Sequence, residues 1–242
     1  LYYYPQQYQT LFYVAFLPGL LAVFASFLLK DKSNSEPIDK KTPSFFSFLN
    51  YWKTSPIEYK KTVIGLLAFA VFNSSDVFLL LKAKQAGLND TYVIGIYIFY
   101  NLVYAIAALP IGILADKIGL KKMFIFGLSL FAIVYFGMAF SENSYLIALF
   151  FFVYGVYAAA TEGVSKAWIS NICDKKDTAT AIGTYSGFQS ISALMASSFA
   201  GLIWYQFGAS ATFITTGIGT ILVIIYFSFF MKDKIIKNDT PT

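Results

Sequence analysis

The chain has 242 residues, of which 57% are hydrophobic and only 13% are charged. Soluble domains carry about a quarter charged residues, so this composition excludes an ordinary soluble protein and indicates a membrane protein. All 18 basic residues are lysine, histidine is absent and Cys173 is the one cysteine, which argues against nucleic-acid binding, an intrachain disulfide and a zinc or iron–sulfur centre.

Seven apolar stretches are long enough to cross a bilayer. The hydrocarbon core is about 30 Å thick, which a helix of about 20 apolar residues can span. The predicted spans, called the first to the seventh below, are residues 10–29, 62–81, 92–114, 123–140, 145–170, 181–205 and 211–231. The sequence therefore predicts an all-α membrane protein with seven transmembrane helices, the last six forming one bundle.

Lysines are concentrated at alternate connections between these spans. The segments 30–61, 115–122, 171–180 and 232–242 hold 15 of the 18 lysines. The positive-inside rule places these segments in the cytoplasm, so the C-terminus is expected there and Leu1 on the outer side. We therefore expect a multi-pass protein of the cell (inner) membrane.

The start of the chain and its one long connection predict the domain organisation. The chain begins at Leu1 and not at Met, and an odd number of spans with an external start suggests that further helices precede it. We expect 1–29 to hold the last helix of a missing N-terminal half, 30–61 to be a cytoplasmic linker with an interfacial segment, 62–231 to form a C-terminal six-helix bundle and 232–242 to be a cytoplasmic tail.

Polar side chains inside a bilayer seldom face lipid, so they indicate which helices line a cavity. The second, third, fifth and sixth spans carry charged or amide side chains, whereas the first, fourth and seventh carry none. An apolar helix in every third place is typical of transporters built from three-helix repeats. The predicted cavity residues are Asn73, Ser75, Asn101, Tyr104, Tyr157 and Gln189. In the alternative, the amides only hydrogen-bond neighbouring helices.

Asp76, in the second span, is the first of three candidates for proton coupling. A carboxylate away from bulk water favours its protonated form, so it could bind and release a proton as its access to water changes. In the alternative, Asp76 lies near the outer headgroups and pairs with Lys82 or Lys84.

The other two candidates, Glu162 and Lys166, are four residues apart in the fifth span. This spacing places them on one face of a helix, where they can form an ion pair. The pair could serve only to neutralise its own charge within the membrane. In the functional alternative, Glu162 exchanges Lys166 for a proton or a charged solute.

The connection after the third span reads GILADKIGLKK, from Gly112 to Lys122. An ordinary cytoplasmic loop explains the lysines and Gly119, but it does not explain Gly112 or Asp116. Gly112 would let another backbone approach closely. Asp116 could accept hydrogen bonds from the N-terminus of the sixth span, near Thr178, and this contact would close the cavity on the cytoplasmic side.

This connection resembles the loop signature of the major facilitator superfamily (MFS) in the C-terminal half of its members. The stretches NSSDVFLLLKAKQAGL at 73–88 and GVYAAATEGVSKAWISNI at 155–172 are also similar to a bacterial branch of that superfamily. The resemblance implies twelve helices in two halves, of which this chain holds the sixth to the twelfth. It also implies a gating role for Gly112, Asp116, Lys117, Gly119, Lys121 and Lys122. Leu120 departs from the signature, which favours a basic residue there.

Together these features predict a secondary active transporter that moves a small solute by alternating access, coupled to protons. The expected partners are the lipid bilayer, the solute, the proton and the missing half of the same protein, with no nucleic acid, cofactor or metal. The chain has no G-x-x-x-x-G-K-[S/T] motif for nucleotide phosphates. Without histidine, or cysteine inside a predicted span, an enzyme is disfavoured. The remaining alternative is a receptor or scaffold that has the transporter fold but does not transport.

Overall fold

The computed structural model describes residues 8–28 and 47–231, and every regular element in these ranges is a helix. The predicted lysine-rich part of the linker, 30–41, and the predicted tail, 232–242, lie outside the described residues. The chain divides into two compact units, residues 1–44 and 45–242. In the first unit, α1 (Tyr8–Phe27) overlaps the first predicted span, residues 10–29, and continues through Pro18.

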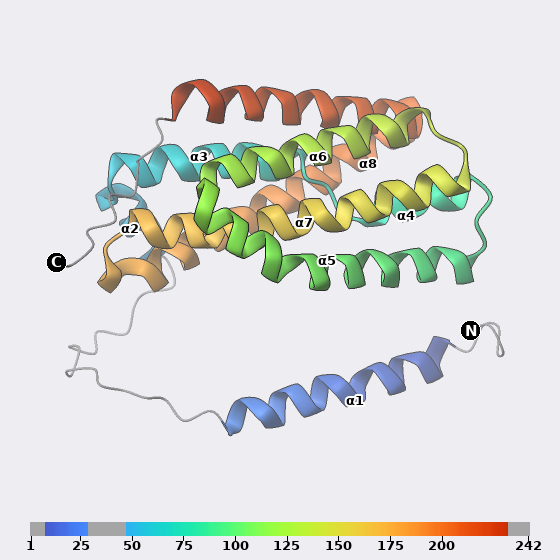
Figure 1. The fold of residues 1–242 in the computed structure, drawn as a ribbon, viewed down its shortest axis with the longest axis horizontal. Helices are drawn as coiled ribbons and strands as arrows, with labels where there is room; N and C mark the ends of the chain where they lie inside the picture. The colour runs from blue at the N-terminus through green and yellow to red at the C-terminus, as the bar shows by residue number, and fades with distance from the viewer. Residues whose placement is uncertain (1–7, 29–46, 232–242) are drawn as a thin grey trace. The chain divides into compact units, whose positions relative to one another are not determined.

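The second unit is a bundle of helices that run side by side (Figure 1). Its elements are α2 (Ser47–Thr54), α3 (Ile57–Phe72), α4 (Val77–Gln85), α5 (Asp90–Ile118), α6 (Leu120–Phe140), α7 (Ser144–Ile172), a 3₁₀ turn (Lys175–Asp177) and α8 (Thr178–Phe230). Within the described residues, five stretches are long and apolar enough to cross a membrane, with α3 and α4 counted as one. The prediction of an all-α membrane protein is confirmed, whereas the number of seven spans is not.

The long helix α8 contains both of the last two predicted spans. Its 53 residues would extend about 80 Å as a straight helix, far more than a hydrocarbon core of roughly 30 Å. The helix is interrupted at Gly208, whose backbone angles are φ 84° and ψ 175°. Figure 1 shows that the parts before and after this residue, orange and red, run in opposite directions. A single residue therefore makes the turn between two antiparallel segments.

Substituting Gly208 by alanine is expected to destabilise the folded protein by about 1–3 kcal/mol, because a Cβ atom disfavours positive φ with ψ near 180°. The space around this position is open, so the loss would be conformational and not steric. Gly187→Ala is the matched control, since Gly187 also lies in α8 in open space but has no positive φ. Thermal unfolding in detergent gives the melting temperature of each variant. Equal melting temperatures for Gly208→Ala and Gly187→Ala would contradict this account of the turn.

The helices α6 and α7 form the centre of the bundle. In the most apolar 18-residue window of each helix, 56% of the residues are buried in α6 and 50% in α7, compared with 11% in α5. The ring centroid of Phe131 in α6 lies 5.1 Å from that of Phe69 in α3 and 4.8 Å from that of Tyr157 in α7. The helix α5 packs against α7 and α6 and leaves most of its own surface exposed. It also continues past Pro110 to Ile118, beyond the predicted end at residue 114.

Residues 47–54 of the predicted linker form the short helix α2, which packs on the bundle. The ring centroid of Trp52 lies 6.3 Å from that of Tyr59 in α3 and 5.6 Å from that of Phe188 in α8. The Tyr59 hydroxyl donates a hydrogen bond to the Ala181 carbonyl oxygen, 2.8 Å away. The two ring contacts hold α2 against α3 and α8, and the hydrogen bond joins the beginnings of α3 and α8 to each other.

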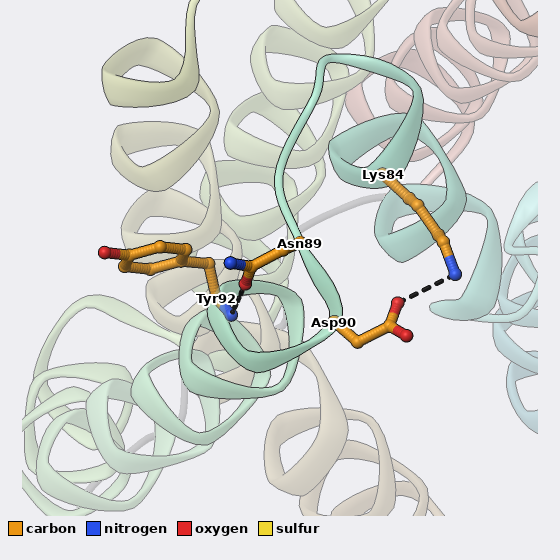
Figure 2. Close-up of polar contacts among 4 residues, drawn as sticks. All are labelled: Lys84, Asn89, Asp90 and Tyr92. Carbon is orange, nitrogen blue, oxygen red and sulfur yellow. Dashed lines mark hydrogen bonds and ion pairs between the residues drawn. The ribbon is translucent and has the colours of Figure 1, made fainter. Parts of the chain in front are cut away.

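Polar contacts close the short connection between α4 and α5 (Figure 2). The Lys84 Nζ atom lies 2.7 Å from Asp90 Oδ1, in a pair whose side chains are 60% and 55% exposed. Such exposed pairs contribute about 1 kcal/mol or less. The Asn89 side chain caps α5 by accepting a hydrogen bond of 3.0 Å from the Tyr92 backbone amide. The cap is therefore the contact that most defines where α5 begins.

Asn89→Ala is expected to lower the free energy of unfolding by about 1 kcal/mol, because it leaves a helix-terminal amide without its cap. Asn143→Ala should have a similar effect, since the Asn143 side chain caps α7 in the same way. Asn171→Ala is the control, because Asn171 is exposed and its side chain makes no hydrogen bond within the described structure. Unfolding in detergent gives the free energy of unfolding of all three variants. A loss of stability in Asn171→Ala as large as in the two cap variants would refute the assignment of Asn89 and Asn143 as helix caps.

Candidate functional site

The break between α3 and α4 places polar groups inside an apolar stretch. The most apolar 18-residue window of the stretch Ile57–Gln85 has a mean hydropathy of 2.0, yet the residues from Asn73 to Asp76 interrupt its helix. Asn73 has φ −81° and ψ 83°, and the Ser74 amide donates to the Phe72 carbonyl oxygen 3.0 Å away, as in an inverse γ-turn. In a bilayer, irregular backbone is tolerated only where it is buried in protein or lines a water-filled cavity.

Asp76, the last residue of this break, is held by Tyr154 of α7. The Tyr154 hydroxyl donates a hydrogen bond of 2.6 Å to Asp76 Oδ1. Asp76 is half-buried and, among the described residues, forms no ion pair, so the alternative pairing with Lys82 or Lys84 is not observed. Lys84 pairs with Asp90 at the connection between α4 and α5 (Figure 2). Asp76 thus carries a carboxylate whose hydrogen-bond partner is a neutral hydroxyl.

Three buried oxygen atoms lie in or beside the break: Asn73 Oδ1, Ser74 Oγ and the Tyr135 hydroxyl of α6. Of these, Asn73 Oδ1 has no hydrogen-bond partner in the described part of the chain. Ser74 is 4% exposed and Tyr135 is 0% exposed. The Tyr135 hydroxyl lies beside both Ser74 and Tyr154, so these oxygens gather next to the Asp76 carboxylate. Native proteins pair most buried polar atoms, and each unpaired one therefore needs an explanation.

Tyr157, one of the predicted cavity residues, lies in the aromatic core. It is 4% exposed, and its ring centroid lies 5.0 Å from that of Tyr154 and 4.8 Å from that of Phe131. Tyr154 in turn packs against Tyr100 of α5, with ring centroids 5.1 Å apart. Tyr157 therefore supports the residue that holds Asp76, and its own ring does not reach an exposed face.

The other predicted cavity residues are exposed or half-buried. They are Asn73 and Ser75 in the break, Asn101 and Tyr104 on α5, and Gln189 on α8. Asn101 donates a hydrogen bond of 2.8 Å to the Tyr97 carbonyl oxygen of its own helix, so this bond does not link two helices. The Ser75 amide donates to Ser197 Oγ of α8, 3.2 Å away. A hollow of about 260 Å³ beside α4, lined by Leu81, Lys84, Gln85 and Trp204, contains none of the predicted cavity residues.

Glu162 and Lys166 are both exposed on α7. No ion pair between them is present in the described structure, so the expected salt bridge one helical turn apart is not formed here. The Tyr104 hydroxyl of α5 lies beside the Glu162 carboxylate. Two opposite charges thus stay exposed on a helix whose most apolar window has a mean hydropathy of 1.7.

The predicted gating residues surround the turn between α5 and α6. Gly119 has φ 99° at this turn, a conformation that favours glycine. Asp116, Lys117 and Lys122 are exposed, Gly112 lies in open space, and Lys121 Nζ hydrogen-bonds to the Met231 carbonyl oxygen beyond the end of α8. Asp116 makes no hydrogen bond or ion pair within the described residues, so its contact with the start of α8 stays a prediction.

Reasoning from the sequence does not identify Tyr135 and Tyr154. Tyr135 lies in the fourth predicted span, which carries no charged or amide side chain and therefore counts as apolar. The missed signal is the phenol group itself, because a buried tyrosine usually needs a partner for its hydroxyl. Tyr135 and Tyr154 thus place their hydroxyls in the apolar interior of α6 and α7.

Comparison with known proteins supports the sequence resemblance. The model of the Major Facilitator Superfamily matches residues 83–242, which include α5 to α8 and the gating motif. The chain is also similar to an uncharacterized MFS-type transporter of Methanocaldococcus jannaschii, with 29% identity over 218 residues. This similarity covers 88% of the chain and 52% of the relative, so the chain spans about half of that relative's length. The chain belongs to the Major Facilitator Superfamily.

Proposed function

We propose that this chain is the C-terminal part of a secondary active transporter that moves a small solute across the cell (inner) membrane by alternating access, coupled to protons. Family membership and the description of the relative as a transporter support transport. The observation that carries the proposal is the exposure of Glu162 and Lys166 on α7. Charges inside membrane-spanning helices are costly and mark the paths of substrates and ions.

The domain organisation predicted from the sequence is part of this proposal. Residues 1–29 would belong to the N-terminal half, 30–61 would link the halves in the cytoplasm, 62–231 would form the C-terminal bundle, and 232–242 would be a cytoplasmic tail. The exposed surface of α5 supports this arrangement, because only 11% of its most apolar window is buried. The N-terminal half would cover that surface and complete the cavity.

Three groups of residues carry the proposed mechanism. Solute would contact Asn73, Ser75, Asn101, Tyr104 and Gln189, with Tyr157 supporting the wall. The ion gradient would act through Asp76, Glu162 and Lys166. Closure on the cytoplasmic side would involve Gly112, Asp116, Lys117, Gly119, Lys121 and Lys122. Because Glu162 is exposed beside Tyr104, it can meet both solute and water in a crevice between the halves.

Flux measurements in proteoliposomes test the proposal. The complete protein would be reconstituted and screened with labelled organic solutes under an imposed proton gradient. We expect uptake of at least one solute that collapses when a protonophore is added. Flux that persists with the protonophore would refute proton coupling alone, whereas binding of a solute without flux would favour a receptor or scaffold.

A further inference from the structure

We infer that the solute is a small organic anion with a carboxylate group, and that Lys166 of α7 binds this carboxylate while Glu162 carries the proton. The inference deepens the proposed function, on which it rests for the access of both charges to a cavity between the two halves. It names the chemical class of the solute and separates the roles of two residues that the proposal treats together.

Both charges lie on the face of α7 that packs against α5 earlier along the helix. Gly155 marks this face, because a Cβ atom added there would lie 2.9 Å from the Tyr100 carbonyl oxygen of α5. Glu162 follows seven residues later, about two helical turns, and Lys166 lies one further turn along, so that all three positions share one side of the helix. The two charges are therefore on the side of α7 that is turned towards α5.

The packing of α7 on α5 opens at the level of these charges. Glu162 and Lys166 are exposed, and a Cβ atom added at Gly163 would meet no atom within 4 Å. Pro110 lies in the second half of α5, where Figure 1 shows the helix changing direction. Charged side chains inside a membrane seldom face lipid, so this opening is the place where solute and water would reach them.

The two charges differ in their neighbours. The Tyr104 hydroxyl of α5 lies beside the Glu162 carboxylate, to which it can donate a hydrogen bond. Lys166 makes no hydrogen bond or ion pair with any residue that the structure describes. A lysine ammonium group donates its strongest hydrogen bonds to ionised acceptors such as carboxylates. Lys166 is therefore the member of the pair that is available to an anionic solute.

The balance of charge explains why an anion would be coupled to a proton. In the absence of solute, the charges of Glu162 and Lys166 cancel. A carboxylate bound to Lys166 adds one negative charge, which is costly inside a membrane. A proton on Glu162 removes one negative charge, so the loaded site is neutral again. A phosphate monoester carries nearly two negative charges and would leave the loaded site charged.

A cationic or a zwitterionic solute does not meet these requirements. A cation would compete with the proton for Glu162, and Lys166 would then have no role. A zwitterion that bridged Glu162 and Lys166 would occupy the carboxylate, so that no proton could bind there. An anion is the class of solute that lets both residues act in the same transport cycle.

Thermal stabilisation of the complete purified protein by small ligands tests the inference. Benzoate and lactate are titrated in detergent at constant ionic strength, with benzamide and lactamide as neutral counterparts and benzylammonium as a cation. We expect at least one carboxylate to raise the melting temperature saturably and its amide not to do so. Lys166→Gln should weaken this binding at least about tenfold, because a charge-assisted hydrogen bond is lost, whereas Lys166→Arg should largely preserve it.

Lys176→Gln is the matched control. Lys176 is also exposed, but it lies in the 3₁₀ turn before α8, outside the membrane-spanning helices, so its substitution should leave carboxylate binding unchanged. Unchanged carboxylate affinity in Lys166→Gln would overturn the inference. The inference would also be overturned if no carboxylate stabilised the protein, or if the amides or the ammonium compound stabilised it as strongly.

The outcomes also separate this inference from the proposed function. Carboxylate binding that depends on Lys166, without flux of any solute, would leave the site intact and overturn transport. Proton-driven flux of a neutral or cationic solute, in a protein that binds no carboxylate, would overturn the site and leave transport intact.

Discussion

Glu162→Gln is expected to abolish the proton-driven accumulation of solute in proteoliposomes, that is, the solute concentration gradient across their membrane. Glutamine keeps the size of glutamate but cannot bind and release a proton. One charge that moves across 100 mV provides about 2.3 kcal/mol, enough to sustain a concentration ratio of about 50. In the variant this ratio should fall towards unity, because the solute can then only equilibrate. The expected effect is large because the substitution removes the step that couples proton movement to solute movement, and not merely one contact with the solute.

The matched control for this variant is Glu142→Gln. Glu142 is exposed in the connection between α6 and α7, outside the membrane-spanning helices, and its replacement should leave the gradient unchanged. Exchange of labelled for unlabelled solute should persist in Glu162→Gln, which would show that the protein is folded and still binds solute. A Glu162→Gln protein that still builds the full gradient would remove Glu162 from the coupling mechanism.

Gly155→Val is expected to prevent stable folding of the bundle. Gly155 lies where α7 packs closely on α5, and a Cβ atom there would be 2.8 Å from Val103 Cγ1 and 2.9 Å from the Tyr100 carbonyl oxygen. Because the carbonyl belongs to helix backbone, it cannot rotate away as a side chain could. Overpacking at such a contact costs about 3 kcal/mol or more, a large fraction of the stability of a folded protein.

The control for Gly155→Val lies on the same helix. Gly163 is eight residues further along α7, and a Cβ atom added there would meet no atom within 4 Å, so Gly163→Val should be tolerated. Size-exclusion chromatography in detergent and thermal unfolding report the outcome. A monodisperse Gly155→Val protein with an unchanged melting temperature would show that α5 and α7 can separate without loss of stability.

The helices can be located from the sequence because their apolar runs match the thickness of a bilayer. The predicted spans 123–140 and 145–170 differ from α6 and α7 by at most three residues at each end. The sequence does not predict the break at Asn73 to Asp76, although its polar residues stand out in an apolar stretch. A hydropathy window averages over the break, which becomes visible only in the backbone angles of Asn73 and in the hydrogen bonds of the Ser74 and Ser75 amides.

The candidate site can be predicted only in part. Asp76 is identifiable because a carboxylate in an apolar span is chemically conspicuous. Its partner Tyr154 is 78 residues away, and nothing local in the sequence specifies which tyrosine faces it. The position of Tyr157 is likewise only partly predictable, because the sequence indicates its depth along the helix but not the direction in which its ring points. Side-chain direction depends on the packing of α7 against α6 and α3.

The connections at one end of the bundle are short (Figure 1). Four residues join α4 to α5, three join α6 to α7, and Gly208 alone reverses α8. Since an extended residue spans at most about 3.6 Å, these tethers leave adjoining helix ends little freedom to part. We therefore expect these helices to move together at this end of the bundle. Sites for inserted tags or antibody epitopes should be scarce at this end.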